Sequence, residues 1–268
     1  MDLSDKGVVI TGAAGGVGSA LAREFAAAGA NLALLDADEA RLGELEQELR
    51  AKHPNATLVP VVVDLTDEDA IIAASKRVMG ELGQLSVLVN NAGIVLRGIP
   101  VQQISSSLWQ RVMGINFMAT VLCVQNFLPY MQADAGPGHI INIASISGLI
   151  MAGDRKTAAY STSKYAVVAY SEALAAELAG SSIKVSIVAP AGVATTLYEN
   201  SALQLDAIPK GETIVKTPDD IANGMPPAEL AKRTFDLVGS DRLYLVTHEY
   251  TRPMIQSRFE KILAGFDD

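Results

Sequence analysis

Thr11-Gly12-Ala13-Ala14-Gly15-Gly16-Val17-Gly18 is the stretch of sequence that decides the fold. It follows a short apolar run at residues 8–10, and it opens a segment at residues 17–28 whose pattern predicts a helix. Glycines between a strand and a helix allow a tight turn and a close approach of the backbone to a pyrophosphate, which the helix N-terminus favours electrostatically. We therefore expect this turn to bind a dinucleotide.

Strand-like and helix-like runs alternate along the rest of the chain. The expected strands are apolar on both faces, which suits a parallel sheet that helices cover. Regular alternation without a break in composition predicts an α/β fold of one domain, residues 1–268. Its core would be a doubly wound, Rossmann-like, mostly parallel seven-stranded sheet with helices on both faces. Strands are expected at residues 8–10, 32–35, 58–63, 87–89, 139–144, 185–188 and 243–246, and helices at 17–28, 39–52, 67–82, 106–131 and about 160–180.

One segment departs from this regularity, at about residues 193–227. Its helix signals are short, and Pro209, Pro218, Pro226 and Pro227 interrupt it. Long stretches without clear elements are usually functional lids or disordered segments. Because this one directly follows the carboxyl end of a strand, we expect a lid over the substrate.

Composition excludes several classes of protein. The 268 residues are 49% hydrophobic and 19% charged, which is ample for a buried core. The net charge is −9 without a Lys/Arg cluster, which argues against nucleic-acid binding. The N-terminus lacks a leader pattern, and no run of about 18 apolar residues suggests a membrane span, so we expect a soluble cytoplasmic protein. Cys123 is expected in the core, and the scattered His53, His139 and His248 indicate no metal site.

Tyr160 and Lys164 stand four residues apart in the last long helical segment. Residues at i and i+4 share one face of a helix, so a phenol and an ammonium would lie side by side. A cation roughly 4–5 Å away, at an effective dielectric of about 20, favours the phenolate by roughly 3–4 kcal/mol. Such a phenolate could take a proton from an alcohol, and its phenol could return one to a carbonyl. This pair therefore predicts acid/base chemistry.

Two acidic residues end predicted strands. Asp36 follows Gly12 by 24 positions, where a carboxylate would meet an adenosine ribose. Its alternative role is to cap the next helix, although Asp38 is equally available for that. Asp64 ends the third strand, and Thr66 with Asp69 resembles a capping pair. Asp64 and its neighbour Leu65 are thus expected to contact the cofactor, Asp64 at the adenine edge.

With these motifs in place, the chain resembles the short-chain dehydrogenase/reductase family from about residue 7 to residue 195. The family's glycine pattern is met by Thr11, Gly12, Gly16 and Gly18, and its Asn-Asn-Ala-Gly by residues 90–93. Its mid-helix Asn, catalytic Ser and Tyr-x-x-x-Lys are met by Asn116, Ser145, Tyr160 and Lys164. The resemblance implies catalytic roles for Asn116, Ser145, Tyr160 and Lys164, and cofactor contacts by Thr11, Gly12, Gly16, Val17, Gly18, Asp36, Asp64, Leu65, Asn91, Ala92, Gly93, Tyr160, Lys164, Pro190, Val193 and Thr195.

Several of these roles have alternatives. Taken alone, Asn116 would be a polar residue satisfied within the core, whereas the resemblance implies that it holds a water linking the Lys to solvent. Ser147 rivals Ser145 as the hydroxyl that stabilises the substrate oxygen. The Asn90 turn could be structural, with Asn90 bonding to backbone across strands. The chain also departs from the family at Ala191, which separates Pro190 from the usual Gly.

The resemblance implies an NAD-dependent enzyme that moves hydride between a nicotinamide and a largely apolar secondary alcohol or ketone. NAD rather than NADP is expected because Asp36 would repel a 2′-phosphate. Alternatives are a cofactor-sensing regulator without activity and an epimerase or dehydratase. Apolar residues wrap most of the helix at residues 106–131 and much of the Tyr160 helix, which predicts a symmetric homo-oligomer, and the resemblance suggests a homotetramer.

Overall fold

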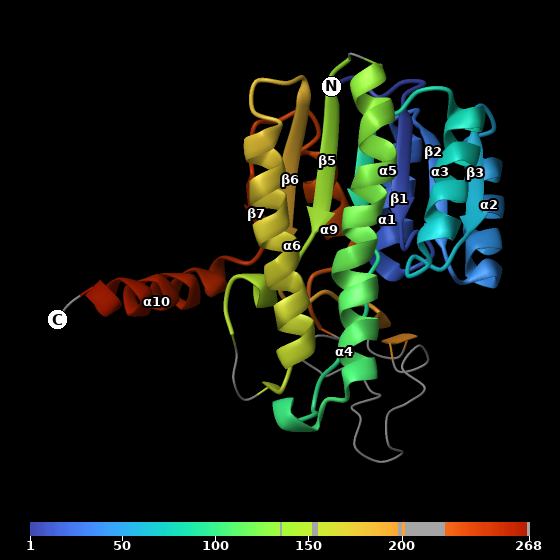
Figure 1. Ribbon diagram of the computed structural model, residues 1–268. Helices are drawn as coiled ribbons and strands as arrows, with labels where there is room; N and C mark the ends of the chain where they lie inside the picture. Colours follow the sequence, from blue (N-terminus) through green and yellow to red (C-terminus); the bar gives the residue numbers. More distant parts are fainter. Residues whose placement is uncertain (135, 152–154, 198–199, 202–222, 267–268) are drawn as a thin grey trace.

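The computed structural model describes residues 1–134, 136–151, 155–197, 200–201 and 223–266 (Figure 1). Seven strands form one sheet in the order β3-β2-β1-β4-β5-β6-β7, and every pairing is parallel. The predicted α/β fold is therefore confirmed, with a sheet that is parallel throughout. The strands are β1 (Gly7–Thr11), β2 (Asn31–Asp36), β3 (Leu58–Val62), β4 (Val87–Asn90), β5 (Gly138–Ile143), β6 (Ile183–Ala189) and β7 (Tyr244–Val246).

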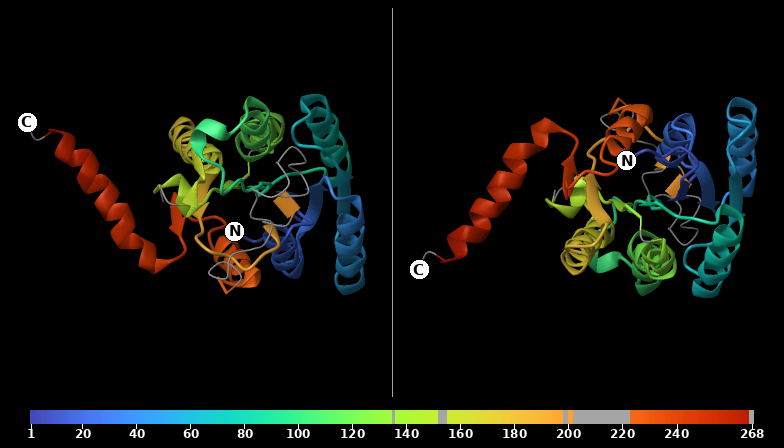
Figure 2. Two further views of the ribbon diagram at one scale, coloured as in Figure 1. Left: turned by 90° about the horizontal axis from the view of Figure 1, so that it is seen from below. Right: turned by 90° about the horizontal axis from the view of Figure 1, so that it is seen from above.

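Helices cover both faces of the sheet (Figure 2). On one face, Val8 and Ile10 of β1 pack in a cluster with α1 (Gly16–Ala27), α2 (Glu39–Lys52) and α9 (Pro227–Phe235). On the other face, Val9 packs with α3 (Glu68–Leu82), α5 (Ala119–Ala133) and α6 (Ala158–Glu177). Cys123 lies in this second cluster, as predicted, and burial raises the pKa of its thiol to about 12. Because alternate strand residues point to opposite faces, both must be apolar.

The helix expected at residues 106–131 forms as one helical stretch, Ser106–Ala133, with a π-helical segment in its middle. It consists of α4 (Ser106–Met113), a π-helical segment η2 (Gly114–Met118) and α5. A π segment inserts one extra residue into a helix and is often found at functional sites. Asn116 lies in it and bonds to Ile94, a long-range contact that the apolar pattern does not reveal.

The predicted capping of the third helix is wrong by one residue. Asp67, not Thr66, is the N-cap of α3, because its carboxylate accepts a hydrogen bond from the backbone N–H of Ala70. Thr66 is instead held by Asp64, through both its backbone N–H and its hydroxyl. Of the two residues available to cap α2, Asp36 and Asp38, the cap is Asp38.

Two helices that the sequence did not predict, α9 and α10 (Arg252–Leu263), form from residue 227 onward. Phe235 of α9 packs edge-on against Phe25 of α1, with ring centroids 5.4 Å apart. Of the expected lid at 193–227, residues 198–199 and 202–222 lie outside the described part of the chain. The two ends of that segment meet, since Val193 and Met225 form a parallel bridge.

Candidate active site

A cavity of about 680 Å³ lies beyond the carboxyl ends of the strands. This is the edge at which open α/β sheets bind ligands. Thr11 and Asn116, although predicted for the site, are buried behind the cavity wall. The other predicted site residues all line it: Gly12, Gly16, Val17, Gly18, Asp36, Asp64, Leu65, Asn91, Ala92, Gly93, Ser145, Tyr160, Lys164, Pro190, Val193 and Thr195.

The glycine-rich turn is shaped by close backbone contacts. Gly12 has a φ of 63°, and a Cβ there would lie 2.8 Å from the Cα of Ala92. A Cβ on Gly18 would lie 2.0 Å from the carbonyl oxygen of Gly12. Any side chain at either position would therefore push the first turn of α1 away from β1 and β4. The turn leaves an open backbone surface at the N-terminus of α1, which suits a pyrophosphate.

The turn after β4 is tied to this glycine-rich turn. The Thr11 hydroxyl accepts hydrogen bonds from the backbone N–H groups of Asn91 and Ala92, at 3.0 and 3.1 Å. The Asn91 amide donates to the carbonyls of Thr11 and Gly12. The side chain of Asn90 donates to the side chain of Asn142 at 2.8 Å. It does not bond to backbone across strands, which was the alternative role raised by the sequence. Thr11 and Asn91 thus fix the cavity wall.

The two strand-ending carboxylates have different surroundings. Asp36 accepts hydrogen bonds from the backbone N–H of Ala14 at 2.8 Å and of Asp38 at 3.0 Å, and it lines the cavity. Its Ala14 contact links it to the glycine-rich turn, so it does not cap α2. Asp64 is not spare as predicted, because it holds Thr66 and pairs with Arg111 at 3.4 Å. Its carboxylate nevertheless remains half exposed at the cavity.

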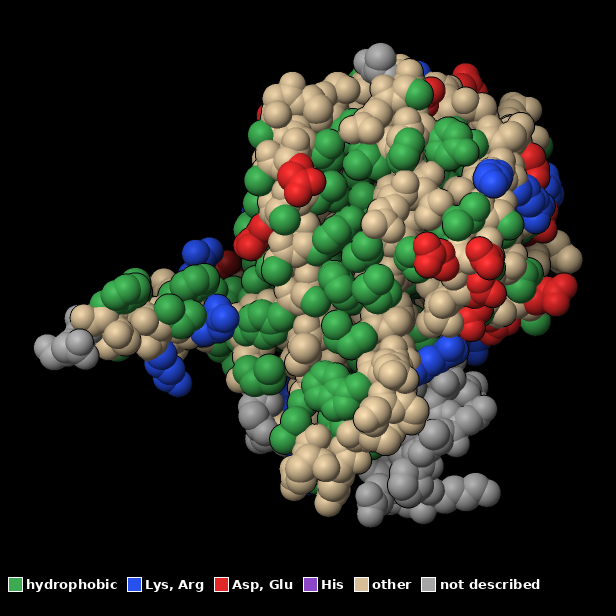
Figure 3. Space-filling view, viewed as in Figure 1, with side chains coloured by type: hydrophobic (Ala, Val, Ile, Leu, Met, Phe, Trp, Pro, Cys, Tyr) green, Lys and Arg blue, Asp and Glu red, His purple; other side chains and the backbone are tan. Residues whose placement is uncertain are grey.

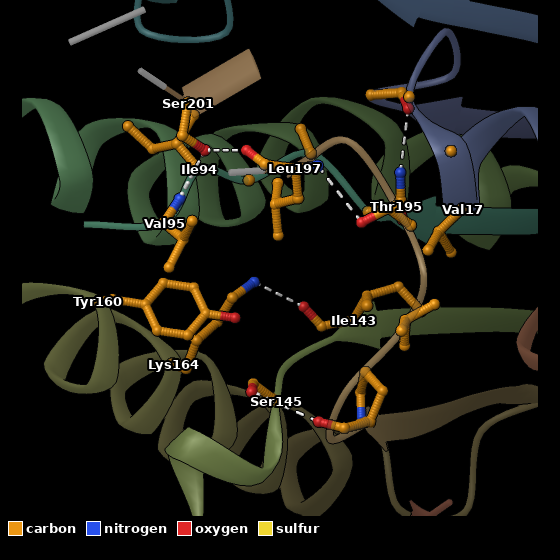
Figure 4. Close-up of a pocket in the computed structure, with 18 of the residues that line it drawn as sticks. Val17, Ile94, Val95, Ile143, Ser145, Tyr160, Lys164, Thr195, Leu197 and Ser201 are labelled. Carbon is orange, nitrogen blue, oxygen red and sulfur yellow. Dashed lines mark hydrogen bonds between the residues drawn. The ribbon is translucent and has the colours of Figure 1, made fainter. Parts of the chain in front are cut away.

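Tyr160 and Lys164 extend from α6 into the same cavity as Ser145, which follows β5 (Figure 4). The Nζ of Lys164 is buried and donates to the carbonyl oxygen of Ile143 at 2.9 Å. Burial lowers the pKa of Lys164 to about 8. The Ser145 hydroxyl accepts from the N–H of Ser147 at 3.1 Å and donates to the carbonyl of Pro190 at 3.4 Å. The rival residue, Ser147, also lines the cavity.

The side chain of Asn116 makes three hydrogen bonds to other protein groups. Its oxygen accepts from the N–H of Ile94 at 2.7 Å, and its nitrogen donates to the Ile94 carbonyl and to Ser163, each at 2.9 Å. A Cβ on Gly93 would lie 3.3 Å from Asn116 Oδ1 and 3.4 Å from Lys164 Nζ. The Asn116 amide, behind the cavity wall, and the Lys164 ammonium, at the cavity, therefore both lie close to the Gly93 backbone.

His248 lies near the site, and no local pattern in the sequence predicted a role for it there. Its Nδ1 accepts a hydrogen bond from the backbone N–H of Ala191 at 3.2 Å. On the other side of this turn, the carbonyl of Pro190 accepts from the N–H of Ile146. Burial lowers the pKa of His248, which favours the neutral ring that can accept this bond. The unusual Pro190-Ala191-Gly192 turn is thus held from both sides.

The end of the cavity near Tyr160 is largely apolar. Ser201 connects its two walls, because its hydroxyl accepts from the N–H of Val95 and donates to the carbonyl of Leu197 (Figure 4). Tyr198 and Asp154, which also follow strand ends in the sequence, lie outside the described residues, and the nearby Leu96, Arg97, Leu149 and Met151 do not line the cavity. The side chains that do line it here include Ile94, Val95, Ile146, Ile150, Arg155 and Leu197. Among the described residues, no cluster of His, Cys, Asp and Glu is arranged to hold a metal ion.

Comparison with known proteins places these residues in a family context. The sequence pattern of the family described as short chain dehydrogenase matches residues 6–206. The chain is 30% identical to 1-deoxy-11-beta-hydroxypentalenate dehydrogenase of Streptomyces exfoliatus, over 98% of this chain and 90% of that protein. It is 31% identical to the CLA biosynthesis dehydrogenase/reductase of Lactiplantibacillus plantarum, over 98% of this chain and 95% of that one.

A solved structure agrees in three dimensions. The crystal structure of a short chain dehydrogenase/reductase from Burkholderia phymatum in complex with NAD superposes with a TM-score of 0.90 at 29% sequence identity. The match covers 99% of this chain and 96% of that one. The fold of this chain agrees with this match. The chain is a member of the short-chain dehydrogenase/reductase family of Rossmann-fold oxidoreductases.

Proposed function

We propose that this protein is an NAD-dependent oxidoreductase that acts on a largely apolar secondary alcohol or ketone. The observation that carries the proposal is the convergence of Tyr160, Lys164 and Ser145 in one cavity with the glycine-rich turn and Asp36. The first three residues supply acid/base chemistry, and the last two supply a cofactor site.

The residues at the glycine-rich end fit a dinucleotide. A Cβ at Gly12 or Gly18 would collide with the backbone of the neighbouring turns, so both glycines keep the turn in the shape that leaves the N-terminus of α1 open. That N-terminus favours an anion such as a pyrophosphate. Asp36 lies at the end of β2, where it can accept hydrogen bonds from ribose hydroxyls. The Burkholderia phymatum relative, whose structure is described as a complex with NAD, supports this choice. When bound, NAD supplies the hydride acceptor of the alcohol oxidation.

The chain's own groups handle the proton. In the oxidation direction, the Tyr160 phenolate accepts the proton of the substrate hydroxyl, and in reduction the phenol returns it to the carbonyl oxygen. The buried Lys164 ammonium favours the phenolate by its charge. The Ser145 hydroxyl, held by Ser147 and Pro190, is oriented to bond the substrate oxygen.

The apolar lining near Tyr160 supports an apolar substrate. The names of two relatives agree with this class, since one acts on a hydroxypentalenate and the other is a dehydrogenase/reductase of CLA biosynthesis. The test is a screen of secondary alcohols and ketones by nicotinamide absorbance, with Tyr160→Phe as the inactive reference. A marked preference for phosphorylated or polyhydroxylated substrates would contradict the proposed class. Cofactor binding without turnover on any substrate would favour the regulator instead.

We also propose a cytoplasmic homotetramer assembled through α5 and α6. Hydrophobic side chains gather over these two helices (Figure 3), and Phe117, Val121, Leu122 and Leu128 are half-buried there. By length and mean hydropathy, 1.4, the stretch Ser106–Ala133 would also suffice to cross a membrane, but half of it is buried inside the fold. Buried core helices can be as long and as apolar as this stretch. In the proposed assembly, packing between copies covers the rest of its apolar surface. Light scattering at micromolar concentration tests the assembly, and the mass of a monomer would contradict it.

A further inference from the structure

The C-terminal helix α10 leaves the body of the protein. Figures 1 and 2 show it extending beyond β7, with the C-terminus at its far end. None of the described residues from 252 to 266, here called the arm, is buried. Helices of about 12 residues are marginal in water without tertiary packing. The arm therefore needs a covering surface that the described part of this chain does not provide.

The arm carries an apolar stripe. Ile255, Phe259, Ile262, Leu263 and Phe266 follow one another at spacings of four, three, one and three residues, which places them on one side of a helix. Phe259 is 53% exposed, Leu263 62% and Phe266 82%. Contiguous exposed apolar side chains of this size mark an interaction surface.

The base of the arm belongs to the candidate active site. Tyr250, Thr251 and Met254 line the cavity, and Arg258 lies over the ring of Tyr165 on α6, 5.1 Å from its centroid. The arm thus begins at the substrate end of the site. Tyr250 and Thr251 are held by their own chain, because the Tyr250 ring packs against His248 and the Thr251 hydroxyl donates to the His248 carbonyl. Met254 lies in the arm itself, so whatever holds the arm also sets the position of Met254.

Two observations favour a second copy of this chain as the covering surface. The arm runs toward the side of the sheet on which α5 and α6 lie, the two helices of the proposed interface between copies (Figure 2). Its hydrophobic side chains also face the same way as those of α5 and α6 (Figure 3). At 1.5 Å per residue, α10 reaches about 18 Å, enough to extend over a copy packed on α5 and α6.

We propose that the arm docks on a second copy of this chain, in a two-fold pair in which each copy's arm covers the other. In such a pair the same surfaces are used twice, so both apolar stripes are buried together. Docking holds Met254 in place at the cavity, so assembly completes this part of the site.

Amide hydrogen exchange of the unaltered protein tests this without a substitution. Amides of residues 256–263 should be protected at concentrations where the pair forms, and they should exchange at least tenfold faster after dilution to the monomer. Fast exchange of α10 within the pair would overturn the proposal. Protection that persists in the monomer would also overturn it, because the arm would then cover its own chain.

A matched pair of variants gives a second test. Phe259→Asp should raise the dissociation constant of the pair at least tenfold by analytical ultracentrifugation, whereas Val101→Asp, at a similarly exposed apolar residue, should not. Phe259→Asp should also raise the KM for substrate several-fold, although Phe259 does not line the cavity. The kinetic measurement rests on the proposed function, whereas the mass and exchange measurements do not. An unchanged dissociation constant in Phe259→Asp would contradict the docking whatever the activity.

Discussion

The Nζ of Lys164 donates a hydrogen bond to the backbone carbonyl of Ile143, 2.9 Å away. This bond fixes the ammonium at the end of β5, inside the protein and beside the cavity that Tyr160 lines. A carbonyl oxygen partly offsets the cost of burying the charge, but it brings no negative charge. Burial therefore lowers the pKa of Lys164 to about 8, close to the working range of an enzyme.

This pKa predicts an alkaline limit to activity. As the pH rises through about 8, Lys164 loses its proton and ceases to favour the Tyr160 phenolate, so kcat/KM should fall. The effect on folding has the opposite direction. Between pH 8 and the ordinary pKa of 10.5, the unfolded chain binds more protons at Lys164 than the folded chain, so this residue's contribution to stability rises with pH.

A pH profile of kcat/KM, with denaturant unfolding at pH 7 and 9.5, checks both statements. Lys164→Met should be inactive at every pH, and its free energy of unfolding should lack the rise expected for the parent. Activity of the parent that still climbed at pH 10 would show that the Lys164 charge is not needed.

Tyr160→Phe keeps the ring and removes the titrating oxygen. Turnover should fall by the roughly 10²–10⁴-fold typical of a lost general base, while cofactor affinity is retained. Tyr170→Phe, on the same helix but outside the cavity, is the matched control and should stay within a few-fold of the parent. Steady-state kinetics and a cofactor titration separate the two effects. If Tyr160→Phe turned over as fast as its control, another group would be the acid/base.

Gly12→Ala should abolish cofactor binding. The new Cβ would lie 2.8 Å from the Cα of Ala92 at a φ of 63°, so the glycine-rich turn must shift. Gly43→Ala in α2 is the control, because nothing lies within 4 Å of its Cβ, and it should stabilise the helix by up to about 1 kcal/mol. Cofactor titration by fluorescence and thermal unfolding measure both. Wild-type cofactor affinity in Gly12→Ala would contradict the assigned site.

Local signals were enough to predict the sheet. Each strand is a short apolar run, and the glycine-rich turn fixes the first βα unit, so the order of elements followed from the sequence. Most predicted cofactor contacts line the cavity because they directly follow strand ends, which converge at one edge of a parallel sheet.

Contacts between distant residues could not be predicted in this way. Asn116 bonds to Ile94 from a π segment, and Asp64 is occupied by Thr66 and Arg111. Both depend on side chains that meet only after folding. His248 lies 57 residues from Ala191, and no local pattern marks it as a partner. The arm was not predicted because none of its described residues is buried, so its pattern follows no sheet or core.

His248 provides a prediction about the unusual Pro190-Ala191-Gly192 turn. His248→Leu leaves the Ala191 N–H without its acceptor, which costs roughly 1–3 kcal/mol and should raise KM more than it lowers kcat. His248→Gln keeps an acceptor and should restore part of the loss. Protonation of the ring removes the acceptor, as the substitution by Leu does. Activity of the parent should therefore decline on the acid side of the lowered pKa of His248. Equal kinetics for the His248→Leu variant, the His248→Gln variant and the parent would show that the turn keeps its shape without the His248 contact.

The last prediction concerns the cofactor. The Asp36 carboxylate lines the cavity, and the N–H groups of Ala14 and Asp38 hold it in place. A 2′-phosphate beside it would bring like charges within a few ångströms, at a cost of roughly 1–4 kcal/mol. This corresponds to about a tenfold to several-hundredfold preference for NAD. Arg41 is a cation that also lines the cavity, but Asp38 pairs with it at 3.4 Å.

The test compares catalytic efficiency with NAD and NADP in the parent, in Asp36→Ala with Ala37→Arg, and in Asp38→Ala. The double variant removes the repelling carboxylate and adds a cation, so its preference should shift toward NADP by at least tenfold. Asp38→Ala frees Arg41 while Asp36 remains, so it should improve NADP use only slightly. If Asp38→Ala reversed the preference, the pairing of Arg41 and not the charge of Asp36 would govern the choice. Equal or better use of NADP by the parent would contradict the argument outright.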